Sequence, residues 1–236
     1  RDTTGGLTTI NINGGTIGVN GSATVGDGNV FGAARGSKDV VQADQNDISR
    51  VRETNVKISG GSIKGNVYGG GELGDVGTIV KNTSDYNYTW QKTGGGSNAV
   101  ENNKISENNT NTGICNVTIT GGTIGSTTEG TGNVFGGGKG DANTWWCEKA
   151  IAFATNISIS KGSDAENAPV VYGSVYGGGE IGRVEDDTKV IIGTADGSDE
   201  PEIKGNVFGA GKGLATRGYS ALVRGNSIVT IQGKAK

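Results

Sequence analysis

The chain repeats a short alternation of apolar and polar residues. Six triplets carry two β-branched residues two positions apart: Ile10/Ile12, Val56/Ile58, Val117/Ile119, Ile157/Ile159, Val190/Ile192 and Val229/Ile231. Successive side chains of a strand point to opposite sides, so each triplet predicts a short β-strand with one buried face. Several triplets are followed by paired glycines and another apolar residue, which predicts a sharp bend between two short strands. No segment shows a sustained helical period, and the sequence therefore predicts an all-β protein.

The second part of the repeat is a glycine-rich block in which an aromatic residue precedes a charged one by four positions. The five pairs are Phe31/Arg35, Tyr68/Glu72, Phe135/Lys139, Tyr176/Glu180 and Phe208/Lys212. Both members alternate along the chain, Phe with Tyr and positive with negative charge. If each block is one rung of a stack, every charge lies between two of opposite sign. We therefore expect these ten residues to form a structural ladder that fixes the register of the stack.

Repetition from end to end predicts one elongated unit over residues 1–236. The expected fold class is a single-stranded parallel β-solenoid, and the general preference for right-handed parallel crossovers makes a right-handed β-helix the expected form. The segment 81–113 interrupts the repeat and is rich in Asn, Ser, Thr and Gly, so we expect a long loop insertion there. In an alternative topology each turn holds two blocks and Phe stacks on Phe, which would bring Lys139 near Arg35 and Lys212.

Composition and charge exclude several classes of protein. The chain has 46 Gly but only 2 Pro, which does not fit collagen. Its net charge of -3 and scattered basic residues predict no nucleic-acid partner. It has no apolar run long enough to cross a membrane, so we expect no membrane insertion in this segment. Both ends fall inside the repeat pattern and methionine is absent, so we expect a fragment whose neighbours are further repeats of a longer parent chain.

The repeat also carries a family resemblance. The pattern Val-x-Ile-x-Gly-Gly-Thr-Ile followed by Asn-Val-Phe/Tyr-Gly-Gly-Gly resembles the glycine-rich repeats of large bacterial surface proteins, which are similar to parallel β-helix adhesins. The resemblance covers most of the chain outside the insertion at 81–113. It implies a secreted protein, located extracellularly or on the bacterial cell surface. Such scaffolds carry adhesins, autotransporter passengers and polysaccharide-cleaving enzymes alike, so no individual functional residue is carried over.

Candidate catalytic and metal-binding residues are few. Histidine is absent, which removes Ser-His, Cys-His and histidine-metal sites. The densest acidic run is 185–187, and the other carboxylates considered are Asp75, Asp196, Asp199 and Glu200. No carboxylate pair recurs on adjacent repeats, as a glycosidase would need, so we expect solvated turn residues. We predict no catalytic residue, no metal site and no cofactor.

Two sets of residues are candidates for recognition and cross-linking. Tyr86, Tyr88 and Trp90 alternate with polar residues in the insertion, and Trp145 and Trp146 follow the third block. Exposed aromatic side chains stack on sugar rings or anchor a protein partner, and the alternative is that they pack over the stack as a lid. The only cysteines, Cys115 and Cys147, bracket one repeat. They either form a disulfide, as suits an exported protein, or are two small buried residues.

The function that meets these observations is not enzymatic. We expect an extracellular adhesin or structural stalk module of a bacterial surface protein that binds a glycan or host-surface protein through its loops. The alternative is a polysaccharide-active β-helix enzyme, a lyase or glycoside hydrolase, that uses surface carboxylates. A stalk or adhesin needs only repeats and a decorated loop, whereas the enzyme needs a constellation of carboxylates that the sequence does not show.

Overall fold

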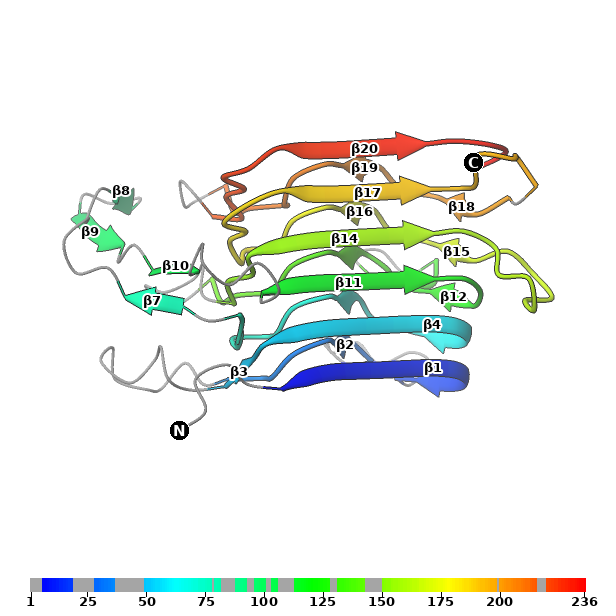
Figure 1. Ribbon diagram of the computed structural model, residues 1–236, viewed down its shortest axis with the longest axis horizontal. Helices are drawn as coiled ribbons and strands as arrows, with labels where there is room; N and C mark the ends of the chain where they lie inside the picture. The colour runs from blue at the N-terminus through cyan, green and yellow to red at the C-terminus, as the bar shows by residue number, and fades with distance from the viewer. Residues whose placement is uncertain are drawn as a thin grey trace.

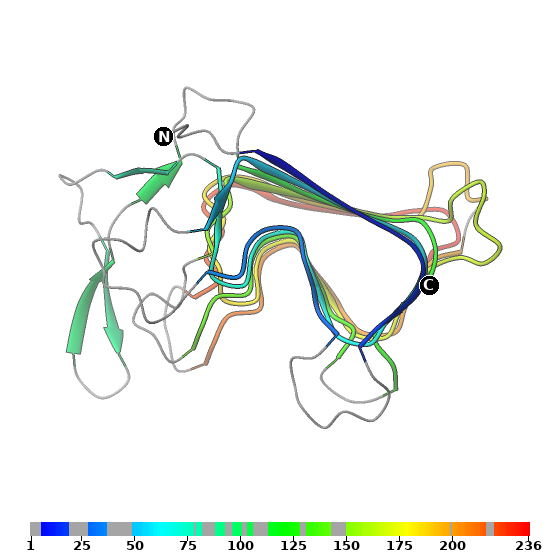
Figure 2. The ribbon, with the colours of Figure 1, turned by 90° about the horizontal axis from the view of Figure 1, so that it is seen from below.

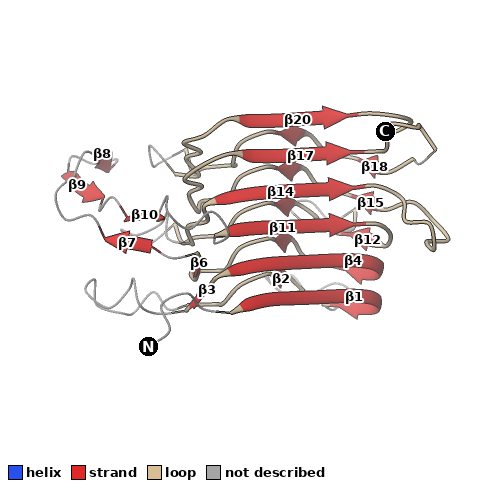
Figure 3. Cartoon of the chain, in the orientation of Figure 1, coloured by secondary structure: helices blue, strands red, loops and turns tan. Residues whose placement is uncertain are grey.

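The structure of the protein is a computed structural model. It describes residues 6–18, 28–36, 49–77, 79–81, 88–92, 96–100, 103–105, 113–127, 131–142, 150–198, 200–215 and 220–236. All regular structure in these ranges is β-strand, and they contain no helix (Figure 3). The all-β prediction is therefore confirmed for the described part of the chain. It follows that these ranges hold no helix that could cross a membrane.

The largest sheet has nine strands, and all of its pairings are parallel. Its long strands are β1 (Leu7–Ile17), β4 (Glu53–Ile63), β11 (Ile114–Ile119), β14 (Ala154–Ile159), β17 (Thr188–Ile192) and β20 (Ser227–Ile231). They pair in this order, each with the next one along the chain. Three short strands, β12 (Thr123–Ile124), β15 (Val170–Val171) and β18 (Glu202–Ile203), extend the second half of β4. The sheet therefore curls where the long strands end (Figure 2).

The paired glycines lie at this curl. Gly15, Gly61 and Gly122 all have a positive φ, of 79°, 88° and 83°, in the left-handed region that favours glycine. Each follows a strand triplet and precedes the next apolar residue, as in Gly61, Ser62 and Ile63. The bend that the sequence predicts after the triplets is thus present.

A second sheet contains the aromatic residues of the five blocks. Its strands are β2 (Val30–Phe31), β5 (Val67–Tyr68), β13 (Val134–Phe135), β16 (Val175–Tyr176) and β19 (Val207–Phe208). They too pair in parallel, in the order β19-β16-β13-β5-β2. A third set consists of β3 (Arg50–Val51), which pairs with β6 (Asp75–Val76), and of parallel bridges that join Ala152, Val184 and Val223.

These three sets define successive passes of the chain, each lying on the one before (Figure 1). Pass 1 holds β1, β2 and β3, and pass 2 holds β4, β5 and β6. Pass 3 holds β11 to β13 and Ala152, pass 4 holds β14 to β16 and Val184, and pass 5 holds β17 to β19 and Val223. Strand β20 then lies on β17. Residues in the same position of successive passes are therefore direct neighbours in space.

The core lies between the long strands and the aromatic-bearing strands. Its buried residues are Ile12, Val30, Val56, Ile58, Ile63, Val67, Val117, Ile119, Ile124, Val134, Ile157, Ile159, Val171, Val175, Val190 and Ile192. Every predicted inward pair from β4 to β17 is included. The register of the strands places equivalent inward-facing residues next to each other: Val117 pairs with Val56 on one side and with Ile157 on the other. Burial of each such side chain contributes about 1.5–3 kcal/mol, which makes these columns the main source of stability.

The described residues in and next to the insertion predicted as a loop form four strands. Strand β7 (Ile79–Lys81) pairs with β10 (Asn103–Ile105), and β8 (Tyr88–Lys92) pairs with β9 (Gly96–Val100); both pairings are antiparallel. These strands lie to one side of the stacked passes, beyond β6 (Figures 2 and 3). The insertion thus departs from the parallel pattern, and the stacking of β4 on β11 continues across it.

Candidate functional site

The aromatic residues of the five blocks form one continuous stack. The ring centroids are 4.7 Å apart for Phe31 and Tyr68, and 4.9 Å apart for Tyr68 and Phe135. Phe135 and Tyr176 are separated by 4.9 Å, and Tyr176 and Phe208 by 4.8 Å, with near-parallel ring planes throughout. Phe therefore stacks on Tyr at every step, and the alternative topology with Phe on Phe is excluded.

Exposure of the rings changes along this stack. Tyr68 and Phe135, in the middle, are 1% and 0% exposed, whereas Phe208 at the last pass is 43% exposed. An aromatic ring gains most of its stabilisation when both faces are covered. The central rungs are therefore part of the buried interior, and the last one lies open.

The charges of the blocks pair between neighbouring passes. Glu72 lies between two cations: its Oε2 is 3.2 Å from Nε of Arg35, and its Oε1 is 2.9 Å from Nζ of Lys139. Glu180 Oε1 is 3.1 Å from Nζ of Lys212. Between the described passes 3 and 4, no ion pair joins Lys139 to Glu180. Since exposed pairs contribute only about 0.2–1 kcal/mol each, these contacts favour one register more than they stabilise the fold.

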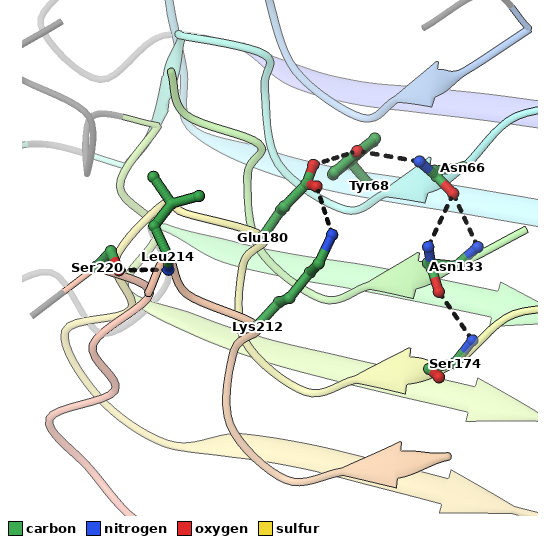
Figure 4. A network of polar contacts seen from close by, with 8 residues as sticks. All are labelled: Asn66, Tyr68, Asn133, Ser174, Glu180, Lys212, Leu214 and Ser220. Atoms are coloured by element: carbon green, nitrogen blue, oxygen red, sulfur yellow. Dashed lines mark hydrogen bonds and ion pairs between the residues drawn. The ribbon is translucent and has the colours of Figure 1, made fainter. Parts of the chain in front are cut away.

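Glu180 also receives a hydrogen bond from two passes away (Figure 4). The hydroxyl of Tyr68 donates to its Oε2 at 2.6 Å, and Asn66 Nδ2 donates to the hydroxyl of Tyr68 at 3.4 Å. Burial, followed by the nearby Glu180 carboxylate, raises the pKa of Tyr68 well above its ordinary value. The intervening rung is Phe135, which has no hydroxyl and needs no acceptor. This contact gives a reason for the Tyr/Phe alternation, which sequence reasoning left unexplained.

A column of polar side chains next to the aromatic stack was missed by sequence reasoning. Asn29 Oδ1 accepts from the backbone N–H of Asn66 at 2.7 Å, and Asn66 Oδ1 accepts from that of Asn133 at 2.8 Å. Asn133 Oδ1 then accepts from the backbone N–H of Ser174 at 2.9 Å (Figure 4). Ser174 Oγ in turn accepts from the backbone N–H of Asn206 at 3.0 Å. Its sequence signal is an Asn or Ser two positions before each aromatic residue. Each side chain satisfies a backbone donor of the next pass.

Buried threonines connect the long strands to the aromatic-bearing strands. Three hydrogen bonds of 2.6 Å run from the Thr hydroxyl to a glycine carbonyl, from Thr54 to Gly69, Thr155 to Gly177 and Thr188 to Gly209. In pass 3 this column holds Cys115, which pairs in register with Thr54 and Thr155. The Cys115 side chain is fully buried, and burial raises the pKa of its thiol to about 12. Cys147 lies outside the described residues, so the disulfide stays a prediction.

The glycines that follow the aromatic residues allow the passes to approach closely. A Cβ added to Gly69 would lie 2.2 Å from the carbonyl oxygen of Gly136, and one added to Gly136 would lie 2.1 Å from that of Gly177. Real Cβ atoms do not approach an oxygen so closely. The glycine-rich block is therefore a packing requirement of the stack.

Two of the candidate carboxylates are buried, and the expectation of solvated turn residues is wrong for them. Glu185, 5% exposed in its side chain, forms an ion pair with Arg183, and its Oε2 is 3.2 Å from Nη1 of Arg224. Asp75 Oδ1 accepts from the backbone N–H groups of Ala150 and Ile151, at 3.1 and 2.9 Å. Asp75 lies beside Val76 on β6, and Glu185 follows Val184, whose bridges belong to the third set. A period-two alternation predicts that the valine side chains are buried, but it does not reveal that the neighbouring acidic side chains are covered as well.

Three of the remaining acidic candidates, Asp187, Asp196 and Glu200, contact other residues of the chain. Asp187 Oδ1 accepts from the backbone N–H of Asn226 at 2.6 Å. Hydrogen bonds from Thr194 and Ser198 lower the pKa of Asp196 to about 2. Glu200 pairs with Lys236 at 2.9 Å, and Asp199 lies outside the described residues. In the described ranges no three His, Cys, Asp or Glu side chains are grouped so that they could hold a metal ion.

The aromatic residues proposed for recognition are placed only in part. Tyr88 and Trp90 lie on β8 of the insertion. Tyr86, Trp145 and Trp146 lie outside the described residues. Comparison with known proteins adds no assignment: no protein-family model, curated protein or solved structure matches the chain.

Proposed function

We propose that the protein is a parallel β-solenoid module that serves as a structural stalk or adhesin on a bacterial cell surface. The observation that carries the proposal is the unbroken parallel pairing of the long strands, from β1 through β4, β11, β14 and β17 to β20. Equivalent residues stack in columns over five passes, as expected when each turn of a solenoid contacts only its neighbours. A right-handed winding is supported by Figure 1, in which the long strands at the front run from left to right, the chain returns behind them from right to left, and successive passes move upward from β1 to β20.

The contacts between passes support a load-bearing role. Each junction between passes combines parallel backbone hydrogen bonds with an aromatic stack, and a polar side chain from the column that begins at Asn29. These contacts run along the stack, so a force applied to its two ends is shared by the backbone hydrogen bonds, the aromatic stack and the polar column. Such a scaffold fits a stalk that holds a binding element away from a surface. The engagement of Glu185 and Asp75 in structural contacts favours this role over the alternative with catalytic surface carboxylates.

The binding element of the proposed adhesin is the insertion. Its strands β7 to β10 lie beside the passes and leave their stacking intact (Figure 1). Aromatic side chains are well suited to stack on sugar rings or to anchor a protein, and β8 carries Tyr88 and Trp90. We propose a glycan or host-surface protein as the partner.

The experiment that tests this function is a glycan and host-surface binding array with the isolated protein. The double variant Tyr88→Ala/Trp90→Ala should lose binding and keep its thermal unfolding transition, whereas Tyr172→Ala, an aromatic control on the stacked passes, should bind as before. Unchanged binding by the double variant would reject the insertion as the binding element. The same protein is incubated with mixed polysaccharides, where release of reducing or unsaturated ends would contradict a non-enzymatic role.

A further inference from the structure

The corner that joins the aromatic-bearing strands to the third set of strands takes two forms. In passes 2 and 4 two residues, Leu73-Gly74 and Ile181-Gly182, separate the charged residue of the block from the third set. In the other passes a longer segment joins the same two points, and its interior lies outside the described residues. These long corners span 36–49, 140–150 and 213–221. Short and long corners therefore alternate along the stack.

Each long corner closes on a short corner of a neighbouring pass. The backbone N–H of Asp75 donates to the carbonyl of Ser49 at 3.1 Å, and the Asp75 carboxylate accepts from the backbone N–H of Ala150. The backbone N–H of Ala221 donates to the carbonyl of Ile181 at 2.7 Å. Ser49, Ala150 and Ala221 are the non-glycine residues with positive φ in the described ranges. These hydrogen bonds thus hold a backbone conformation that is unfavourable by itself.

The alternation of the corners fits the spacing of the passes. Neighbouring strands of a sheet lie about 4.8 Å apart, so every second pass is about 10 Å away. Two layers with side chains between them also pack about 10 Å apart. A long corner on every second pass leaves this room for its side chains, whereas long corners on adjacent passes would not.

The ladder has the same two-pass period. A long corner follows each rung of Phe and a cation, and a short corner follows each rung of Tyr and an anion. Glu72 pairs with cations from the passes on both sides, Arg35 and Lys139. The Tyr68 hydroxyl reaches Glu180, which belongs to the next pass of the same kind. Passes of the two kinds thus differ in three features that change together.

The other columns do not distinguish the two kinds of pass. The inward-facing pairs of the long strands are β-branched in every pass. Asn66, Asn133 and Ser174 each accept from the backbone N–H of the following pass, whatever side chain that residue carries. These columns would allow any pass to stack on any other, so only the ladder and the corners specify the order of the passes.

We propose that the ladder and the corners together form a two-pass lock, in which each kind of pass is accepted only beside the other kind. Two passes are then the unit by which the stack can change its length and keep its fold. In a stack of equivalent repeats a single pass would be that unit. This inference rests on the stacked architecture proposed above and is independent of adhesion through the insertion.

Three internal deletions of the full chain test the lock. The register of the long strands supplies matched junctions, because Cys115, Thr155 and Thr188 are equivalent positions of β11, β14 and β17. The variants lack pass 3, pass 4 or both passes, and the residues removed are 115–154, 155–187 and 115–187, respectively. All three variants keep the insertion, and their melting temperatures are compared by circular dichroism.

Removal of a single pass brings passes of the same kind together. Without pass 3, Glu72 lies beside Glu180; without pass 4, Lys139 lies beside Lys212 and two long corners are adjacent. Like charges opposite each other across strands are destabilising. Removal of both passes puts Lys212 beside Glu72, so the alternation continues. The two-pass deletion, although the shortest chain, should therefore melt about 5 °C or more above both single-pass deletions.

An exchange of rungs separates the lock from other effects of a deletion. Four substitutions turn pass 4 into a Phe/cation rung and pass 5 into a Tyr/anion rung: Tyr176→Phe, Glu180→Lys, Phe208→Tyr and Lys212→Glu. In the variant without pass 3 they restore the alternation and should raise the melting temperature. In the full chain the same substitutions break the alternation and should lower it.

Two results would overturn the proposal. One is a two-pass deletion that fails to fold or melts no higher than either single-pass deletion, as expected if the passes are equivalent. The other is a rung exchange that shifts the melting temperature in the same direction in both chains. Neither result depends on Tyr88 or Trp90, so failure here is distinct from failure of the adhesive role.

Discussion

The hydroxyl of Tyr68 donates a 2.6 Å hydrogen bond to Oε2 of Glu180, a residue 112 positions later in the chain. The two residues belong to passes 2 and 4, and the Phe135 ring stacks on Tyr68 from the pass between them. The contact therefore binds three passes into one unit. It also distinguishes tyrosine from phenylalanine rungs, because only a tyrosine hydroxyl requires a carboxylate acceptor from another pass.

Replacement of Tyr68 by Phe should destabilise the protein. A hydrogen bond to a charged group contributes about 1.5–3 kcal/mol, so Tyr68→Phe should lower the free energy of unfolding by about that amount. Tyr176→Phe is the matched control, since its hydroxyl has no partner among the described residues, and its effect should be close to zero. Denaturant unfolding of the three proteins measures both values, and equal losses would contradict the assigned hydrogen bond.

The stabilities of wild type and Tyr68→Phe should also respond differently to alkaline pH. The pKa of Tyr68 in the folded protein is raised above its usual value near 10, so the unfolded chain loses this proton first. The resulting stabilisation is complete below pH 10 and is lost as the pH rises beyond it. The stability difference between wild type and Tyr68→Phe should therefore narrow above pH 10. A difference that stays constant up to pH 11 would show that the Tyr68 proton is not retained.

Reversal of the charge at Glu72 should disturb the register. Glu72→Lys removes two ion pairs and puts a third cation between Arg35 and Lys139, a loss of about 1–2 kcal/mol. Glu166→Lys, at an exposed site with no ion pair to any described residue, is the control and should have almost no effect. Thermal unfolding gives the comparison, and the gap between the variants should shrink in high salt. Equal melting temperatures would reject the charge ladder as a register device.

A methyl group in the glycine column should be poorly tolerated. In Gly136→Ala the new Cβ would meet the Gly177 carbonyl oxygen at 2.1 Å, so the passes must move apart, at a cost of about 3 kcal/mol or more. Gly14→Ala is the control, because its Cβ would have no atom within 4 Å. If both variants unfold at the same denaturant concentration, close approach of the passes at this column is not required.

Much of the fold was predictable from the sequence because its signals are local. The β-branched pairs such as Val56/Ile58 specify a buried strand face by themselves, and the Gly60-Gly61 pair specifies the bend. The alternating charges identified which blocks are neighbours, since Glu72 can satisfy both Arg35 and Lys139 only if the blocks stack in chain order.

Features that arise only from stacking were not predictable. The role of Asn133 depends on a backbone N–H group of the next pass, 41 residues away in sequence. The Tyr68–Glu180 contact passes over a rung, whereas sequence reasoning considered only adjacent rungs. Glu185 is buried although it follows an inward-facing valine, because other residues cover the outward side of the chain at this position. A period-two pattern of apolar residues does not encode such covering.

Replacement of Cys115 by threonine should be tolerated. Thr54 and Thr155, the neighbours of Cys115 in register, each donate to a glycine carbonyl, so a threonine can make the same bond. We expect Cys115→Thr to keep or raise the stability by about 1 kcal/mol, the contribution of one hydrogen bond. Cys115→Ala, which offers no hydroxyl, is the control and should be less stable than wild type.

The Cys115→Thr variant should also lose a pH dependence of the unfolding free energy that the wild type shows. The pKa of Cys115 is raised from 9.0 to about 12, so the wild type loses stability between these values as the unfolded thiol ionises. Cys115→Thr should lack this contribution. Mass analysis of the wild type with and without reduction tests the predicted disulfide to Cys147; a mass increase of two protons on reduction would establish it and contradict a free thiol at Cys115.

The most direct test of the stacked arrangement is the set of nuclear Overhauser effects between aromatic rings in solution. Ring centroids 4.7–4.9 Å apart should give strong signals from Tyr68 to Phe31 and Phe135, and from Tyr176 to Phe135 and Phe208. The account predicts this Phe-Tyr-Phe-Tyr-Phe chain of contacts and no signal between Phe31 and Phe135. A direct signal between Phe31 and Phe135, or the absence of signals between successive rungs, would contradict it.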